Sequence, residues 1–113
     1  MKQKVIAVIG AGEATASLAA VAEEVGREIA RNGCMLVCGG LGGVMAAAAR
    51  GAREEGGITV GILPQANRDS ANPHITVAVA TGFGEGRNVI IARTADALIA
   101  VGGEYGTLSA IAY

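Results

Sequence analysis

Glycine-rich turns are the part of this sequence whose residue types and spacing could do chemistry. Glycine lets backbone N–H groups approach an anion closely, and a helix that follows adds the positive end of its dipole. The clusters therefore predict a site for a phosphate group, although in any single cluster glycine could simply make a tight turn. Each of the four clusters follows an apolar run: Gly10 and Gly12; Gly39, Gly40, Gly42 and Gly43; Gly82, Gly84 and Gly86; and Gly102, Gly103 and Gly106, which precede Thr107.

Two common types of phosphate-binding loop do not fit these clusters. A Walker A loop ends in lysine followed by serine or threonine, and no cluster has that pair. A dinucleotide-binding loop reads G-x-G-x-x-G, and an acidic residue stands near the end of the second strand. The first cluster has Thr15 in place of the third glycine, and the second run ends in Cys38 and Gly39. Walker-type hydrolysis of ATP or GTP is therefore excluded, and binding of NAD or FAD is disfavoured.

The elements that would position these turns follow from the hydrophobic pattern. Short apolar runs predict strands, and apolar residues that recur every three or four positions predict helices. The longest predicted helix carries apolar residues at Leu18, Val21, Val25 and Ile29. The predicted strands are 4–9, 34–38, 58–63, 75–79 and 97–101, and the predicted helices are 17–31, 43–56, 86–95 and a last one from 107 onward.

This alternation of strands and helices predicts the α/β class. We expect one Rossmann-like domain over residues 1–113, with three layers and a parallel sheet of about five strands. The carboxyl ends of parallel strands lie along one edge of a sheet, and ligands bind in the crevice there. All four glycine clusters would face that edge, so the pattern predicts one pocket for a phosphate or a nucleotide.

Composition excludes several classes of partner. The chain has nine basic and ten acidic residues and no basic block, so we expect no binding of nucleic acid. No apolar run approaches 18 residues, so we expect no membrane-spanning helix. Cys34 and Cys38 would lie about 13 Å apart along one strand, too far for a disulfide. Free thiols predict a reducing cytoplasm. The single histidine leaves too few ligands for a metal site.

Two longer segments carry a resemblance to a known family. The second turn and its helix, CGGLGGVMAAAARGA, resemble the glycine-rich segment of the LOG-like proteins, which are also called lysine-decarboxylase-like. The segment GRNVIIARTADALIAVGGEYGTLS resembles their arginine-containing helix, followed by a strand and a P-G-G-x-G-T-x-x-E loop. The similarity covers nearly the whole chain and is strongest to the small branch that includes the molybdenum-cofactor carrier proteins.

The resemblance implies a ligand and an activity. In that superfamily the glycine-rich loops hold the phosphate of a nucleoside 5'-monophosphate or a similar ligand. Catalytic members cleave the N-glycosidic bond between the base and ribose 5'-monophosphate, and they use an arginine and the motif glutamate. The arginine corresponds to Arg87, whose neighbour Asn88 could also bind the ligand, but the motif glutamate falls on Ala110. Glu104 could replace it only from a different side of the turn.

Other polar residues each have a functional and a structural interpretation. Thr107 could bind phosphate or cap the last helix, and Glu13 and Thr15 could border the pocket or cap a helix. Arg87 could bind phosphate, remain solvated or pair with Glu85. We expect a core position for Met45, an ion pair between Arg93 and Asp96, and an exposed His74 in the polar loop over residues 64–74, which could act as a lid.

The sequence leaves two candidate functions. The first is a carrier-like module that binds a phosphate-bearing nucleotide or a molybdopterin-type ligand, with no cofactor required. The second is a phosphoribohydrolase acting on a nucleoside monophosphate, which Ala110 disfavours. The family would add at least a strand and a helix after Tyr113, so the chain is either truncated or covered there by a partner subunit. We therefore expect a homodimer or a higher homo-oligomer.

Overall fold

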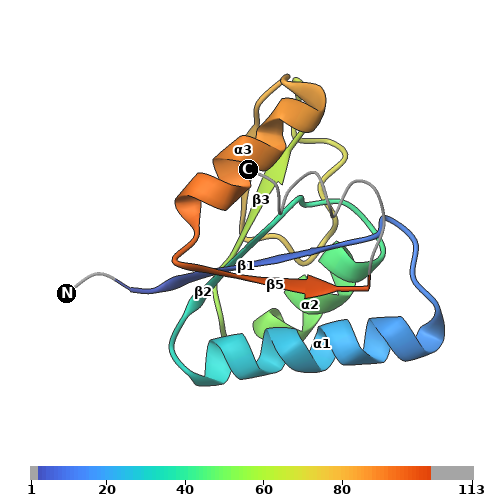
Figure 1. Ribbon diagram of the computed structural model, residues 1–113, viewed down its shortest axis with the longest axis vertical. Helices are drawn as coiled ribbons and strands as arrows, with labels where there is room; N and C mark the ends of the chain where they lie inside the picture. Colours follow the sequence, from blue (N-terminus) through green and yellow to red (C-terminus); the bar gives the residue numbers. More distant parts are fainter. Residues whose placement is uncertain (1–2, 103–113) are drawn as a thin grey trace.

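The chain folds into three layers, with a sheet between helices (Figure 1). The computed structural model describes residues 3–102. Helices α1 and α2 cover one face of the sheet and α3 covers the other. The elements in chain order are β1 (Val5–Gly10), α1 (Ala16–Arg31), β2 (Met35–Cys38), α2 (Val44–Glu54), β3 (Thr59–Leu63), β4 (Val77–Ala80), a 3-10 turn (Gly84–Gly86), α3 (Arg87–Thr94) and β5 (Ala97–Val101).

All five strands are parallel, in the order β4-β3-β2-β1-β5. The chain therefore moves outward from β1 through β2 and β3 to β4, and then returns across the sheet to place β5 on the other side of β1. This order confirms the predicted α/β fold with a parallel sheet of about five strands. It also makes the carboxyl ends of β1, β2 and β5 neighbours at one edge of the sheet.

Helix α1 begins and ends where the sequence provides caps. The Thr15 hydroxyl accepts the N–H of Leu18 at 3.2 Å, so Thr15 is the N-cap. At the other end, the Asn32 amide donates to the Glu28 carbonyl at 2.7 Å, and Gly33 follows with a φ of 73°. Such a left-handed residue after a helix favours glycine because it has no Cβ.

Helices α1 and α2 approach each other at the distance of backbone contact. A Cβ atom built on Gly26 would lie 1.9 Å from the Ala48 carbonyl oxygen, and one built on Gly51 would lie 2.0 Å from the Glu23 carbonyl oxygen. No side chain fits at either position, so these glycines are required by packing. Ala22, Ala48 and Ala52 complete the contact and are fully or almost fully buried.

A group of ion pairs lies along the exposed side of the same two helices. Arg27 pairs with Glu23 on its own helix and with Glu54 of α2, and Arg31 reaches Glu55 at 3.3 Å. The pKa of Arg27 is raised chiefly by its side-chain hydrogen bond to Glu24, and that of Arg31 chiefly by its side-chain hydrogen bond to Glu28. Because such pairs are exposed, they contribute little to stability, and the glycine contacts hold the helices together.

One predicted strand boundary and one predicted core residue differ from the structure. Strand β4 begins at Val77, whereas the sequence pattern placed its start at Ile75. The reason is a side-chain network: the Thr76 hydroxyl accepts the backbone N–H of Thr59 at 3.1 Å and lies at 3.1 Å from the Thr59 hydroxyl, in place of a regular ladder. Val21 was predicted to face the core, but it is 54% exposed because no described residue covers that part of α1.

The described residues also show the state of the two cysteines and the length of the helices. Cys34 and Cys38 are both free thiols, as predicted. Among the described residues, no helix is long and apolar enough to span a membrane, and no group of three potential ligands could hold a metal ion.

Candidate functional site

The turns that follow β1 and β2 are in direct contact at the carboxyl edge of the sheet. The Val44 N–H donates to the Ala11 carbonyl at 3.0 Å, which ties the start of α2 to the first turn. A Cβ atom on Gly43, whose φ is 63°, would lie 2.4 Å from the same oxygen. One on Gly42 would lie 3.3 Å from the Gly12 carbonyl. The structure therefore brings these two predicted clusters together, and Gly43 must be glycine.

The helix that starts at this contact has no side-chain cap. Gly43 is the N-cap of α2 and makes no capping hydrogen bond, and the first turn of the helix contains no acidic residue. Helix α1, by contrast, is capped by Thr15. Neither the N-cap nor the first turn of α2 therefore supplies a negative side chain to the positive end of the helix dipole. Such an end is a favourable place for an anion.

The peptide groups of the second turn have an unusual set of partners. The carbonyl oxygens of three consecutive residues, Gly39, Gly40 and Leu41, each accept a hydrogen bond from a side chain of another segment. Within residues 3–102, no acceptor receives the N–H of Leu41, Gly42 or Gly43. Three carbonyl groups of the turn are thus occupied and three of its N–H groups have no described acceptor, which is the polarity that an anion requires.

Arg87 supplies the first of these side-chain donors. Its Nη1 donates to the carbonyl oxygens of Gly39 and Ile62, at 2.8 Å each, so one guanidinium nitrogen joins the ends of β2 and β3. A Cβ on Gly39 would lie 2.1 Å from the Arg87 Nη1, so a side chain there would displace the guanidinium from this position. Burial lowers the pKa of Arg87. The solvated arginine and the ion pair with Glu85, which were the structural alternatives for Arg87, do not occur among the described residues.

One polar side chain next to Arg87 is buried, and one polar atom of Gln65 is buried as well. Asn88 is only 7% exposed, and none of the hydrogen bonds between described residues uses its amide. Gln65 follows β3, and its Oε1 is buried without a hydrogen-bond partner in the described part of the chain, as is the Nε of Arg87. Gln65 was not among the predicted site residues. Its position just beyond a strand, at the carboxyl edge of the sheet, was the available signal.

The remaining predicted positions lie at the edge of this contact, away from it, or outside the described residues. Gly10 packs against the second turn, because a Cβ there would lie 2.6 Å from the Val44 Cγ1, and Gly102 follows β5 beside Leu18. The Gly82–Gly86 turn instead contacts the segment after β3, where the Gly82 N–H donates to the Gln65 carbonyl at 2.8 Å. The predicted positions outside the described residues are Gly103, Glu104, Gly106, Thr107 and Ala110.

Three other predictions have a structural outcome. Met45 is 6% exposed and belongs to the core, as predicted. Asp96 does not pair with Arg93; its carboxylate accepts the N–H of Val5 at 2.9 Å and fixes the start of β1, so that prediction was wrong. His74 is half-buried, not exposed, because the loop before β4 is held down by hydrogen bonds from Asn72.

The Cys38 thiol lies directly beneath the second turn. Burial raises its pKa to about 11, while a hydrogen bond from the Gly40 N–H and the charge of Arg87 act in the opposite direction. The thiol is therefore protonated at neutral pH and is not a nucleophile there. The thiol fills the core and donates to the Met45 carbonyl at 3.9 Å.

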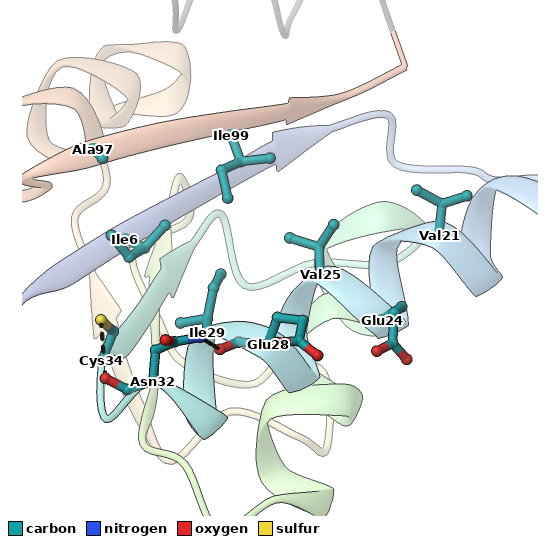
Figure 2. Close-up of a pocket in the computed structure, with 10 residues that line it drawn as sticks. All are labelled: Ile6, Val21, Glu24, Val25, Glu28, Ile29, Asn32, Cys34, Ala97 and Ile99. Atoms are coloured by element: carbon teal, nitrogen blue, oxygen red, sulfur yellow. Dashed lines mark hydrogen bonds between the residues drawn. The ribbon is translucent and has the colours of Figure 1, made fainter.

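A groove of about 580 Å³ lies elsewhere, between α1 and the β1–β5 side of the sheet (Figure 2). Val21, Val25 and Ile29 of α1 face Ile6 and Ile99 of the strands across it. Glu24 and Glu28 lie along its rim on α1. The groove contains none of the predicted ligand residues, and its apolar lining does not suit a phosphate. It is therefore separate from the glycine turns.

Comparisons with known proteins agree with the sequence resemblance. The model of the SLOG cluster4 family matches residues 3–113. A protein of Archaeoglobus fulgidus is 50% identical over 112 residues, which are 99% of this chain and 74% of that protein. The structure of the molybdenum cofactor binding protein from Rippkaea orientalis is 39% identical, with a TM-score of 0.96 over 99% of this chain and 70% of that one. The Moco carrier protein from Chlamydomonas reinhardtii is 35% identical, with a TM-score of 0.89 over 98% and 69%.

Proposed function

The chain belongs to the SLOG cluster4 family, and we propose from this membership that it binds a phosphate-bearing nucleotide or a molybdopterin-type ligand and carries it unchanged. The similar proteins of Rippkaea orientalis and Chlamydomonas reinhardtii are described as a molybdenum cofactor binding protein and a carrier of that cofactor. Their similarity supports molybdenum cofactor as the first ligand to test. The partner is then a small molecule, and we expect no nucleic acid to bind.

The observation that carries this proposal is the set of free N–H groups at the start of α2. The N–H groups of three consecutive residues, Leu41, Gly42 and Gly43, have no hydrogen-bond acceptor among the described residues. They lie next to a helix end that has no side-chain cap. A phosphate group carries several oxygens that accept such hydrogen bonds, and it is stabilised by the helix dipole. The first glycine turn forms the other wall of the site. There, a Cβ on Gly12 would meet no atom of residues 3–102 within 4 Å.

The geometry favours binding over hydrolysis. Arg87, the arginine expected to serve catalysis, has one guanidinium nitrogen fully engaged by two backbone carbonyls. The motif glutamate of catalytic relatives falls on Ala110, whose methyl group can neither transfer a proton nor stabilise a positive charge at the sugar carbon. A hydrolase would need another acid in the site. The two turns contain one acidic residue, Glu13, and no hydrogen bond between described residues holds its carboxylate in place.

Incubation with ligands tests the proposal. We expect AMP, inorganic phosphate or molybdenum cofactor to raise the thermal unfolding midpoint, because a ligand at a hundred times its Kd stabilises the native state by about 2.7 kcal/mol. We also expect chromatography to detect no free adenine after incubation with AMP. The absence of any shift with all three ligands would contradict the proposal. Adenine release that disappears in Arg87→Ala would establish the hydrolase instead.

We further propose that the protein self-associates through the apolar groove and the adjacent edge strand. Within the described residues β5 pairs only with β1, and Val21 and Ile99 expose 54% and 37% of their surface beside it. A second copy would cover this surface and the unpaired strand edge together. We expect the chain to elute from a sizing column as a dimer or larger, and the double variant Val21→Glu with Ile99→Glu to elute as a monomer. A wild-type chain that elutes as a monomer at high concentration would overturn this proposal.

A further inference from the structure

Asn72 makes more contacts with the second glycine turn than any residue that sequence reasoning selected. Its Nδ2 donates to the Leu41 carbonyl at 2.8 Å and to the Gly40 carbonyl at 3.2 Å. Its backbone N–H donates to the same Gly40 oxygen at 2.8 Å. Its Oδ1 accepts the N–H of His74 at 2.9 Å, so both ends of the amide are used and its orientation is fixed.

These contacts fix the orientation of two peptide groups. In a trans peptide the C=O of one residue and the N–H of the next point in opposite directions, and the described chain has no cis peptide bond. Holding the oxygens of Gly40 and Leu41 toward Asn72 therefore turns the N–H groups of Leu41 and Gly42 away from it. These are two of the three donors that reach no described acceptor. Gly40, with a φ of 77°, supplies the left-handed backbone that this arrangement requires.

We propose that Asn72 is a positioning residue of the anion site, which acts on the ligand only through the peptide groups that it orients. This inference rests on the proposed function. It gives the polar loop before β4 a role: the loop serves as a fixed support for the phosphate turn, not as a lid that moves over the ligand. Arg87 completes the support by holding the preceding Gly39 carbonyl, so three carbonyls in succession are bound from outside the site.

The loop contains a matched control. Asn67 also uses its side chain locally, accepting the Asp69 N–H with Oδ1 at 3.0 Å. An aspartate at position 67 keeps that bond and adds one negative charge to the same loop. An aspartate at position 72 adds the same charge but loses both donations to Gly40 and Leu41. Leucine at position 72 loses the donations without adding a charge.

The test compares Asn72→Asp, Asn72→Leu and Asn67→Asp with the wild type, using inorganic phosphate and AMP in calorimetric titrations. We expect both Asn72 variants to bind at least tenfold more weakly and Asn67→Asp to bind within twofold of the wild type. Urea unfolding confirms that each variant folds. In the Asn72 variants without ligand, the ¹⁵N–¹H resonances of Leu41 and Gly42 should move while the other amide resonances stay in place. A general loss of stability would not produce this pattern.

The outcomes separate this inference from the proposed function. If the wild type binds and the Asn72 variants bind as well as it does, Asn72 does not position the site, and the proposed function stands. If Asn67→Asp loses as much affinity as Asn72→Asp and Asn72→Leu loses none, charge alone explains the effect and the inference fails. If the wild type binds neither probe nor molybdenum cofactor, the proposed function fails, and this inference fails with it.

Discussion

Replacing Gly26 by leucine is expected to lower the free energy of unfolding by more than about 3 kcal/mol, at the upper end of the cost of overpacking. Leucine is a better helix former than glycine, so helix propensity alone predicts a gain of somewhat under 1 kcal/mol. The expected loss has the opposite sign because the first side-chain atom would already lie 1.9 Å from the Ala48 carbonyl oxygen. That oxygen belongs to the backbone of α2, so the two helices would have to separate. Urea denaturation, followed by circular dichroism, measures the change.

Ala20→Leu is the matched control for this prediction. Ala20 lies on the same helix and is exposed, so leucine there adds bulk without a contact to disturb. We expect the free energy of unfolding of this variant to lie within about 0.5 kcal/mol of the wild-type value. If Gly26→Leu were as stable as Ala20→Leu, the close contact between α1 and α2 would not exist in solution.

Replacing Gly12 by leucine is expected to leave the fold intact and to weaken phosphate and AMP binding more than tenfold. Among the described residues, a Cβ at this position would meet no heavy atom within 4 Å, and Gly12 is not among the glycines with positive φ. The described part of the protein therefore tolerates a side chain there. The open space lies beside Gly42, at the wall of the proposed anion site, so a leucine side chain would occupy the volume that the ligand needs.

The unfolding midpoint and the binding titration must be measured on the same preparation of this variant. An unchanged midpoint with lost binding places the ligand over the first turn. Unchanged binding would show that the ligand does not use the space above Gly12, and would restrict the site to the second turn. Gly43→Ala is a useful contrast: the φ of 63° and the contact with Ala11 predict that it loses stability and binding together.

The sequence was sufficient to predict what depends on local patterns. The spacing of apolar residues identified α1, and Asn32 and Gly33 marked its end, because caps and periodicity are properties of neighbouring residues. The clustering of glycines after apolar runs predicted that the turns following β1 and β2 share one edge of a parallel sheet. The contact between Val44 and Ala11 agrees with that expectation.

Properties that depend on contacts between distant residues were not predictable in this way. Arg87 was expected to face a ligand, but its Nη1 binds carbonyls 25 and 48 residues away in the sequence. Asn72 was overlooked because an asparagine in a polar loop has no distinguishing local pattern. Val21 has the spacing of a core residue, and its exposure depends only on what covers α1.

The backbone contact between α1 and α2 has a consequence for the energetics of recognition. Each helix follows one of the two glycine turns, and Gly26 and Gly51 let the two helix backbones come into contact. We infer that this contact fixes the separation of the turns before a ligand arrives. A ligand bound at such preorganised turns would lose little affinity to the ordering of the backbone. The tightness of a helix crossing remote from the proposed anion site would thereby help to determine how strongly that site holds a phosphate.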